Sequence, residues 1–335
     1  MKLNKSYRGL AVLASTGVFV ASGSLLAAQT QSPTFSGGVV KIYDATLIPG
    51  IVSLFAKGPL VMKDGKRTKI YAHRDAQAAS KNLISTREYF RQKYGLNSYD
   101  GKGASIQASI NVNRFAYPDI LGMKHNAAWA SGRFLFGAGG KQLLDHFPQA
   151  LDVVAHEFTH AVIENSCDLK YAGESGALNE HLADFFGAAV QFHYEKSENP
   201  FLIGETILRG KIAEKAEALR DMMNPELGLD EQPSHVSELA AGAKYEKYSI
   251  NCVPGQGNDQ CGVHVLSGIP NRATALLVTT IGFEDAEKIV YPVMMNRLKT
   301  DSNFNDYAAA LRAECSNVSE FACQAVDSAL QDVGL

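Results

Sequence analysis

The sequence predicts an α+β protein with a mixed, β-rich N-terminal half and an all-helical C-terminal half. Residues 39–72 alternate apolar and polar positions between glycine and proline breaks, which indicates strands. Strand-like stretches return at residues 105–115 and 127–137. After about residue 150 the apolar positions follow a helical period almost to the end of the chain. This change of period is the reason to expect two structurally different halves.

The N-terminus has the pattern of a signal peptide over residues 1–28. Basic residues precede an apolar run at residues 10–21, and small residues follow that run. The run is short for a membrane span, and no later stretch is both long and apolar enough. We therefore expect a secreted or periplasmic protein without stable membrane association after signal cleavage; an uncleaved anchor is the alternative. Residues 29–38 are a polar lead-in linker.

Two local signals define elements within the N-terminal half. The run KDGKRTK at residues 63–69 contains Asp64 and Gly65, a pair that favours a tight hairpin turn, and its basic residues are expected to face solvent. Residues 76–95 have helical periodicity, and Gly95 is expected to end that helix.

The composition restricts the class of partner. The 335 residues are 46% hydrophobic and 20% charged, and the formal net charge is -3. This is an ordinary globular composition, long enough for one large or two medium domains. A protein whose main partner is nucleic acid needs a basic face, so we expect no nucleic acid partner.

The cysteines predict two short disulfides. Cys252 and Cys261 bracket a loop rich in proline, glycine and asparagine, and Cys315 and Cys323 bracket a short helical turn. In an exported protein these local pairs are the economical pairing, and Cys167 is left over. No C-x-x-C pair is present, which argues against a zinc site made of thiolates.

The stretch DVVAHEFTHAVIEN at residues 152–165 carries the first chemical signal. His156 and His160 are four residues apart in a helical pattern, so both rings project from one face and can hold one metal ion. Glu157 lies beside the first histidine, where it can act as a general base. The alternative interpretation is a pair of core histidines with a glutamate on the helix surface.

A second helical stretch, YAGESGALNEHLADFFG at residues 171–187, supplies carboxylates. A catalytic site with two histidine ligands needs a third protein ligand and one open position, and Glu180 can be that ligand. Metal-bound histidine usually donates its other N–H to a carboxylate, a role that Asp184 can fill. The alternative is that both carboxylates lie on a solvated helix face, which the surrounding alanine, phenylalanine and glycine residues disfavour.

These two stretches resemble the thermolysin-like neutral metallopeptidases, a family of secreted bacterial zinc endopeptidases. The resemblance continues in HNAAW (125–129), ALRDMM (218–223) and DQCGVHVLSGIPN (259–271), and it extends from about Tyr43 to Leu335. Thermolysin is itself a standard example of a zinc site built from two histidines and a glutamate. The resemblance therefore implies one catalytic Zn²⁺ held by His156, His160 and Glu180, with Glu157 as the base.

The resemblance also implies residues that act on the substrate. His264 and Tyr171 match the family's donors to the developing oxyanion, and Asp259 matches the carboxylate that orients that histidine. Arg220 matches the arginine that binds a substrate carbonyl. Asn126 and Ala127 match the edge that pairs with an extended peptide. The positions that match the family's primary pocket, all apolar, are Leu144, Phe147, Val153, Ile203 and Leu219.

The positions that match the family's paired calcium site are depleted in charge. Asp152 and Glu205 supply carboxylates, whereas Gln191 and Phe201 occupy the other two positions. Calcium takes 6–8 oxygen ligands, and its affinity follows the number of charged ones. We expect at most one weakly bound Ca²⁺.

Together these observations predict a zinc-dependent endopeptidase that cleaves before bulky hydrophobic residues in peptide or protein substrates. The first domain, residues 39–165, includes the helix with both histidines, and the helical domain covers residues 166–335; the zinc-site cleft lies between them. We expect a monomer. The alternatives are a narrow-specificity cell-wall or processing peptidase with the same site, and a catalytically silent binding domain stabilised by zinc.

Overall fold

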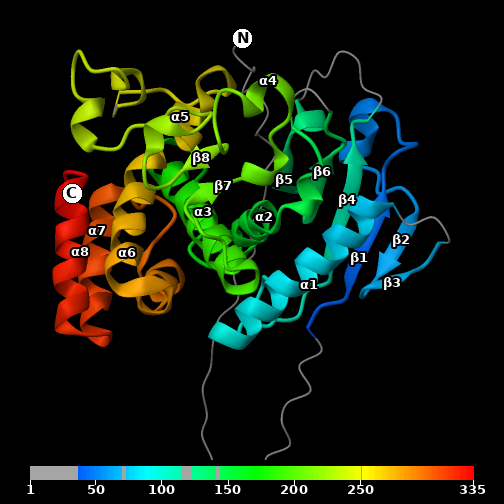
Figure 1. Cartoon of the computed structure of the whole chain (residues 1–335), viewed down its shortest axis with the longest axis horizontal. Coiled ribbons are helices and arrows are strands. Elements are labelled where there is room, and N and C mark those ends of the chain that lie inside the picture. The colour runs from blue at the N-terminus through cyan, green and yellow to red at the C-terminus, as the bar shows by residue number, and fades with distance from the viewer. Residues whose placement is uncertain (1–36, 70–72, 115–121, 141–143, 250) are drawn as a thin grey trace, which may run out of the picture.

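A computed structural model describes residues 37–335 except 70–72, 115–121, 141–143 and 250. The predicted signal peptide and all but the last two residues of the lead-in lie outside the described residues. In Figure 1 the main sheet lies on one side of the molecule, helices α6, α7 and α8 lie on the other, and α2 and α3 lie between them. This arrangement confirms the predicted α+β fold class.

The N-terminal half is built on a six-stranded mixed sheet with the order β3-β2-β1-β4-β6-β5. β4 pairs in parallel with β1 and β6, and the remaining neighbours are antiparallel. β5 is therefore an edge strand. The strands are β1 (Val40–Asp44), β2 (Leu60–Lys63), β3 (Lys66–Arg67), β4 (Ile106–Val112), β5 (Ala127–Ala130) and β6 (Arg133–Gly137).

The predicted hairpin and the first predicted helix are confirmed. Asp64 and Gly65 turn between β2 and β3 with φ of 46° and 76°, values that an Asp-Gly pair tolerates. Helix α1 (Arg74–Tyr94) ends at Gly95, whose φ of 69° is left-handed. One segment departs from the expected strands: η1 (Gly50–Leu54) is a 3₁₀ helix that follows Pro49.

The described part of the C-terminal half consists mainly of helices, with loops and short 3₁₀ helices between them and one short ladder of strands. β7 (Leu202–Ile203) pairs with β8 (Arg220–Asp221), so this half is not all-helical as predicted. Two residues per strand are too few for an alternating pattern to be visible in the sequence. The helices are α2 (Leu151–Glu164), α3 (Gly173–Glu195), α4 (Gly210–Ala213), α5 (Asp259–Leu266), α6 (Gly268–Pro292), α7 (Phe304–Glu314) and α8 (Glu320–Asp332).

Helices α2 and α3 pack closely at the centre of the molecule. Every residue of α2 from Leu151 to Ile163 is buried, and most of α3 is buried as well. A β-carbon on Gly187 of α3 would lie 2.8 Å from the carbonyl oxygen of Asp152, so only glycine permits this approach. The polar side chains of α2 must therefore find partners within the protein.

The predicted cysteine pairing is confirmed. Disulfides join Cys252 to Cys261 and Cys315 to Cys323, and Cys167 is a buried free thiol. None of the helices in the described ranges has the length and apolarity that a membrane span requires.

Candidate active site

Three donor atoms converge where α2 crosses α3. The Nε2 atoms of His156 and His160 lie 3.0 Å apart. Glu180 of α3 places one carboxylate oxygen 3.5 Å from the first of these nitrogens and the other 3.6 Å from the second. All three side chains are buried, and their donor atoms lie within 4.8 Å of one another.

Contacts on the far sides of the two rings determine which nitrogens carry protons. Asn179 donates through its Nδ2 to the carbonyl of Leu169, so its Oδ1 is the atom that faces His160 Nδ1 at 2.7 Å. His156 Nδ1 lies 2.8 Å from Asp184 Oδ1. Both Nδ1 atoms thus carry the proton, and both Nε2 atoms point their lone pairs toward the same space.

This donor set fits a metal cation. Two lone pairs 3.0 Å apart repel each other unless a cation lies between them and the nearby carboxylate. Without a metal, a proton takes that place: burial alone would lower the pKa of His156, but its contacts with Asp184 and Glu180 raise it to about 9. Two histidines and a carboxylate are the ligands of a zinc site that retains an open position.

Asp184 is bound by several donors behind the histidines. Arg220 donates to both of its oxygens, over 2.8 and 2.6 Å, and Asn271 donates to Oδ2 over 2.9 Å. Burial would raise the pKa of Asp184, but the charge of Arg220 and the contact with His156 hold it well below its ordinary value. Asp184 is therefore ionised although it has no exposed surface.

Glu157 lies beside the converging donors, between α2 and the edge strand β5. One of its carboxylate oxygens accepts a 2.8 Å hydrogen bond from the backbone N–H of Trp129. The side chain is buried at the boundary of the same cavity as His156. A carboxylate in this position can exchange a proton with a water molecule in the cavity.

Tyr171 and His264 contact the same oxygen of Glu180 that faces His160. The Tyr171 hydroxyl donates to Glu180 Oε1 and lies 3.1 Å from His264 Nε2. His264 is held by Asp259, whose carboxylate accepts from the backbone N–H over 2.9 Å and contacts Nδ1 at 2.6 Å. The structure thus brings together these residues from α5 and from the loop before α3.

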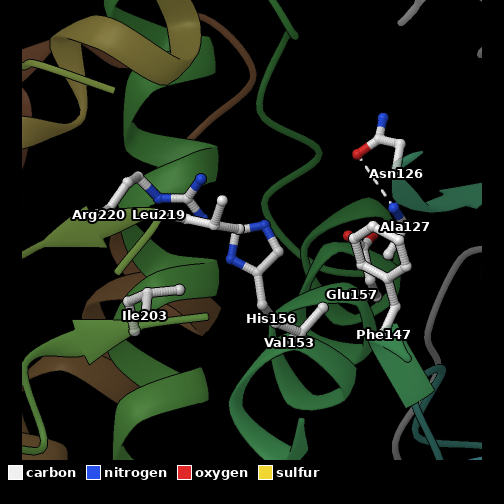
Figure 2. Close-up of a pocket in the computed structure, with 9 residues that line it drawn as sticks. All are labelled: Asn126, Ala127, Phe147, Val153, His156, Glu157, Ile203, Leu219 and Arg220. Carbon is white, nitrogen blue, oxygen red and sulfur yellow. Dashed lines mark hydrogen bonds between the residues drawn. The ribbon is translucent and has the colours of Figure 1, made fainter. Parts of the chain in front are cut away.

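Figure 2 shows the residues that line a cavity between the two halves, with His156 drawn between those of the two sides. On one side lie Asn126 and Ala127, where the backbone N–H of Ala127 donates to Asn126 Oδ1 over 3.0 Å. On the other side lie Leu219 and Arg220. The lining is completed by Phe147, Val153, Glu157 and Ile203.

Leu144 is the one predicted pocket residue that does not line this cavity. It forms an isolated antiparallel bridge with Leu208, and this pairing keeps its buried side chain in the surrounding core. The residues that sequence reasoning missed are Asn179 and Asn271, which orient His160 and Asp184. Asn179 directly precedes Glu180 on a buried helix, a position that could have drawn attention to it.

Three residues at positions that match the family's calcium site come from neighbouring segments: Asp152 from α2, Gln191 from α3 and Glu205 from the segment after β7. Asp152 accepts from the backbone N–H of Gly204, and Gln191 donates to Glu205 over 2.8 Å. Burial and the nearby Glu205 raise the pKa of Asp152 to about 7. Asp152 Oδ1, Gln191 Oε1 and Glu205 Oε2 are buried and have no hydrogen-bond partner in the described part of the chain.

Phe201 does not belong to this cluster of oxygens. Its ring packs against Phe283, with 6.2 Å between the ring centroids, and its side chain has no oxygen to offer. The expected fourth position of the calcium site is therefore filled by an apolar contact.

Two family models match most of the chain. The thermolysin metallopeptidase catalytic domain matches residues 51–164, and the thermolysin metallopeptidase alpha-helical domain matches residues 167–335. An extracellular elastase of Staphylococcus epidermidis is 33% identical over 252 residues, which are 75% of this chain and 44% of the elastase. A thermolysin of Alicyclobacillus acidocaldarius subsp. acidocaldarius is 31% identical over 310 residues, 88% of this chain and 50% of that protein.

Among solved structures, the precursor of protealysin, a metalloproteinase from Serratia proteamaculans, has a TM-score of 0.72 at 28% identity. The superposition covers 91% of this chain and 90% of that one. The chain belongs to the thermolysin family of metallopeptidases. It spans about half the length of the elastase and thermolysin relatives that it matches.

The Asp184–Arg220 pair leads to a stability prediction. Asp184→Asn leaves a buried guanidinium without its counter-charge, and breaking a buried pair in this way costs ~3–5 kcal/mol. Urea unfolding, with zinc present and after chelation, measures the loss. The matched control is Asp332→Asn, which breaks the exposed Arg272–Asp332 pair (2.9 Å) and should cost less than about 1 kcal/mol. Equal losses in both variants would contradict the prediction.

Proposed function

We propose that the protein is a zinc-dependent endopeptidase that hydrolyses internal bonds of peptide or protein substrates. The observation that carries this proposal is the convergence of the Nε2 atoms of two histidines with Glu180, next to Glu157 and a cavity. Zinc supplies Lewis acidity there, toward the scissile carbonyl and a water molecule. His156, His160 and Glu180 would hold the ion.

Glu157 acts as the base in this mechanism. The N–H of Trp129 binds one of its oxygens, which holds the carboxylate beside the cavity. Glu157 takes one proton from the attacking water, so that the remaining hydroxide adds to the carbonyl carbon. It then gives that proton to the leaving nitrogen as the C–N bond breaks, and the carboxylate is regenerated. The proton taken from water is the one that the leaving nitrogen receives, so the reaction needs no other proton donor.

Tyr171 and His264 stabilise the negative charge that develops on the carbonyl oxygen. The two groups lie 3.1 Å apart and face the same side of Glu180, so both can donate toward one oxygen. Donors already held in place before the reaction act most strongly on charge that grows in the transition state. Asp259 keeps the ring of His264 oriented through its 2.6 Å contact.

The substrate binds as an added strand along β5. This strand lies at the edge of the sheet, and the backbone of Ala127 and the amide of Asn126 border the cavity. The side chain that follows the scissile bond enters the cavity between Phe147, Val153 and Leu219, with Ile203 completing the apolar wall. This wall favours bulky hydrophobic residues, because a charged side chain would lose its hydration there.

We further propose that the mature protein is exported and acts as a monomer. The signal-peptide pattern in the sequence supports export, and one relative carries the name extracellular elastase. The residues proposed for catalysis border one cavity of a single chain, which is compatible with a monomeric enzyme.

Replacing the base should separate metal binding from catalysis. Glu157→Gln keeps all three metal donors, so zinc content and melting temperature should match the wild type while kcat falls by about 10²- to 10⁴-fold. The control is Glu320→Gln, the same change at an exposed residue at the start of α8, which should retain activity. Near-normal turnover by zinc-loaded Glu157→Gln protein would refute the mechanism.

The cavity wall predicts the cleavage preference. In a peptide library, products should show Leu, Phe or Ile on the leaving-group side of the cut. Val153→Ala widens the cavity and should shift the preference toward larger side chains, whereas Leu144→Ala should not, because Leu144 does not line it. A dominant Lys, Arg or Asp at that position would show that the cavity does not select the substrate.

Calcium should have little effect on stability. Asp152, Gln191 and Glu205 offer two carboxylates, which can hold one ion weakly but cannot compensate the repulsion between two. We expect at most one calcium per chain and a small change of melting temperature between excess calcium and a calcium-selective chelator. Asp152→Asn should remove even that change. Two tightly bound calcium ions, or a large melting shift with zinc retained, would disprove this expectation.

A further inference from the structure

The turn that leads into His264 has an unusual backbone. Asp259, Gln260, Cys261 and Gly262 are four successive residues with positive φ, at 57°, 51°, 66° and 74°. Only the last is glycine, and a β-carbon there would meet the ring of Tyr248 at 2.7 Å. The other three residues carry β-carbons in a conformation that L-residues disfavour, so the turn needs external support.

This left-handed turn positions the histidine that the proposed mechanism uses. Because the backbone reverses its hand between residues 259 and 262, the carboxylate of Asp259 reaches both the backbone N–H and the ring Nδ1 of His264. The side chain of His264 thereby points its Nε2 toward Tyr171 and Glu180. A turn that relaxed to right-handed geometry would move Asp259 away from the ring.

Two features support the turn. The side chain of Asn258 accepts from the N–H of Cys261 over 3.1 Å and from that of Gly255 over 2.9 Å. The disulfide joins the buried Cys261 to Cys252 at the start of the same loop. Between the two cysteines the loop lies at the surface, where Val253 is 80% exposed.

We propose that the Cys252–Cys261 disulfide is a positioning element of the catalytic site: it holds the left-handed turn and thereby the orientation of Asp259 and His264. The inference rests on the proposed function, because it assigns the turn a role in that reaction. The sulfur atoms do not contact the substrate. Their effect passes through the backbone conformation at Cys261.

The second disulfide provides a matched control. Cys315 and Cys323 are eight residues apart, against nine for the first pair, so the two bridges restrict the unfolded chain to a similar extent. The second bridge joins the end of α7 to the start of α8, and Cys315 has an ordinary helical φ of -60°. Removing it tests the loss of a disulfide without disturbing the left-handed turn.

Three double variants test the proposal in zinc-loaded enzyme. Cys252→Ala/Cys261→Ala should lower kcat by about 10- to 10²-fold, below the loss expected for removing an oxyanion donor outright. KM and zinc per chain should not change. Cys252→Ala/Cys261→Gly also lacks the disulfide, but glycine adopts positive φ freely, so kcat should return to within about threefold of the wild type. Cys315→Ala/Cys323→Ala should melt at a lower temperature and retain kcat.

A chemical test covers the case in which the alanine variant does not fold. In folded Cys315→Ala/Cys323→Ala protein, a phosphine reductant converts the remaining disulfide into two thiols and becomes a phosphine oxide with oxygen from water. The kcat should fall as the thiols appear while zinc stays bound, and it should recover when an added disulfide compound reoxidises the pair and leaves as its dithiol.

The outcomes separate this inference from the proposed function. If the wild-type protein binds zinc but cleaves no peptide, the proposed function itself is wrong. If the wild type is active, the inference is overturned by full kcat in the alanine variant or after reduction. It is also overturned if the glycine variant is as slow as the alanine variant, since the disulfide would then act by some route other than the backbone at residue 261.

Discussion

The structure depends on how charged groups are accommodated between two buried helices. Asp184 and Glu180 have no exposed surface, and His156 is 3% exposed. A single uncompensated charge in such a place would be strongly destabilising. Arg220 and Asn271 donate to Asp184, and Asp184 in turn lies against the ring of His156. The contacts that make the burial tolerable are therefore the same contacts that orient the candidate metal donor.

Sequence reasoning identified the parts of the site that are encoded locally. The spacing of His156 and His160 on one helix, and the appearance of Glu180 on the next, predicted that the three would meet, and their donor atoms do converge. Asn179 and Asn271 escaped notice because their partners lie 19 and 87 residues away in the chain. The periodicity of the sequence does not predict which asparagine amide will contact which histidine or carboxylate.

The departures from prediction have a common cause, which is that short or irregular segments leave no period to read. The β7–β8 ladder has two residues per strand, yet it aligns Ile203 with Arg220 and so brings both to the cavity. Leu144 occupies its place because of a single bridge to Leu208. Such contacts between distant segments determine where a side chain lies, but they produce no periodic pattern in the sequence.

The two sides of the site are held by different means. The metal-donor side consists of regular helices, in which packing and paired charges maintain the geometry. The His264 side depends on a turn that places three non-glycine residues at positive φ, a conformation that costs roughly 1–2 kcal/mol for each of them. A disulfide that closes so short a loop contributes on the order of 2–3 kcal/mol. Summed over the three residues the cost is about 3–6 kcal/mol, so the cross-link can offset between about a third and all of the strain. Hydrogen bonds that the Asn258 side chain accepts from the backbone act on the same turn. Elsewhere in the described chain single L-residues such as Asp64 and Ser98 have positive φ without a disulfide, whereas here three follow one another, and the cross-link stabilises that run.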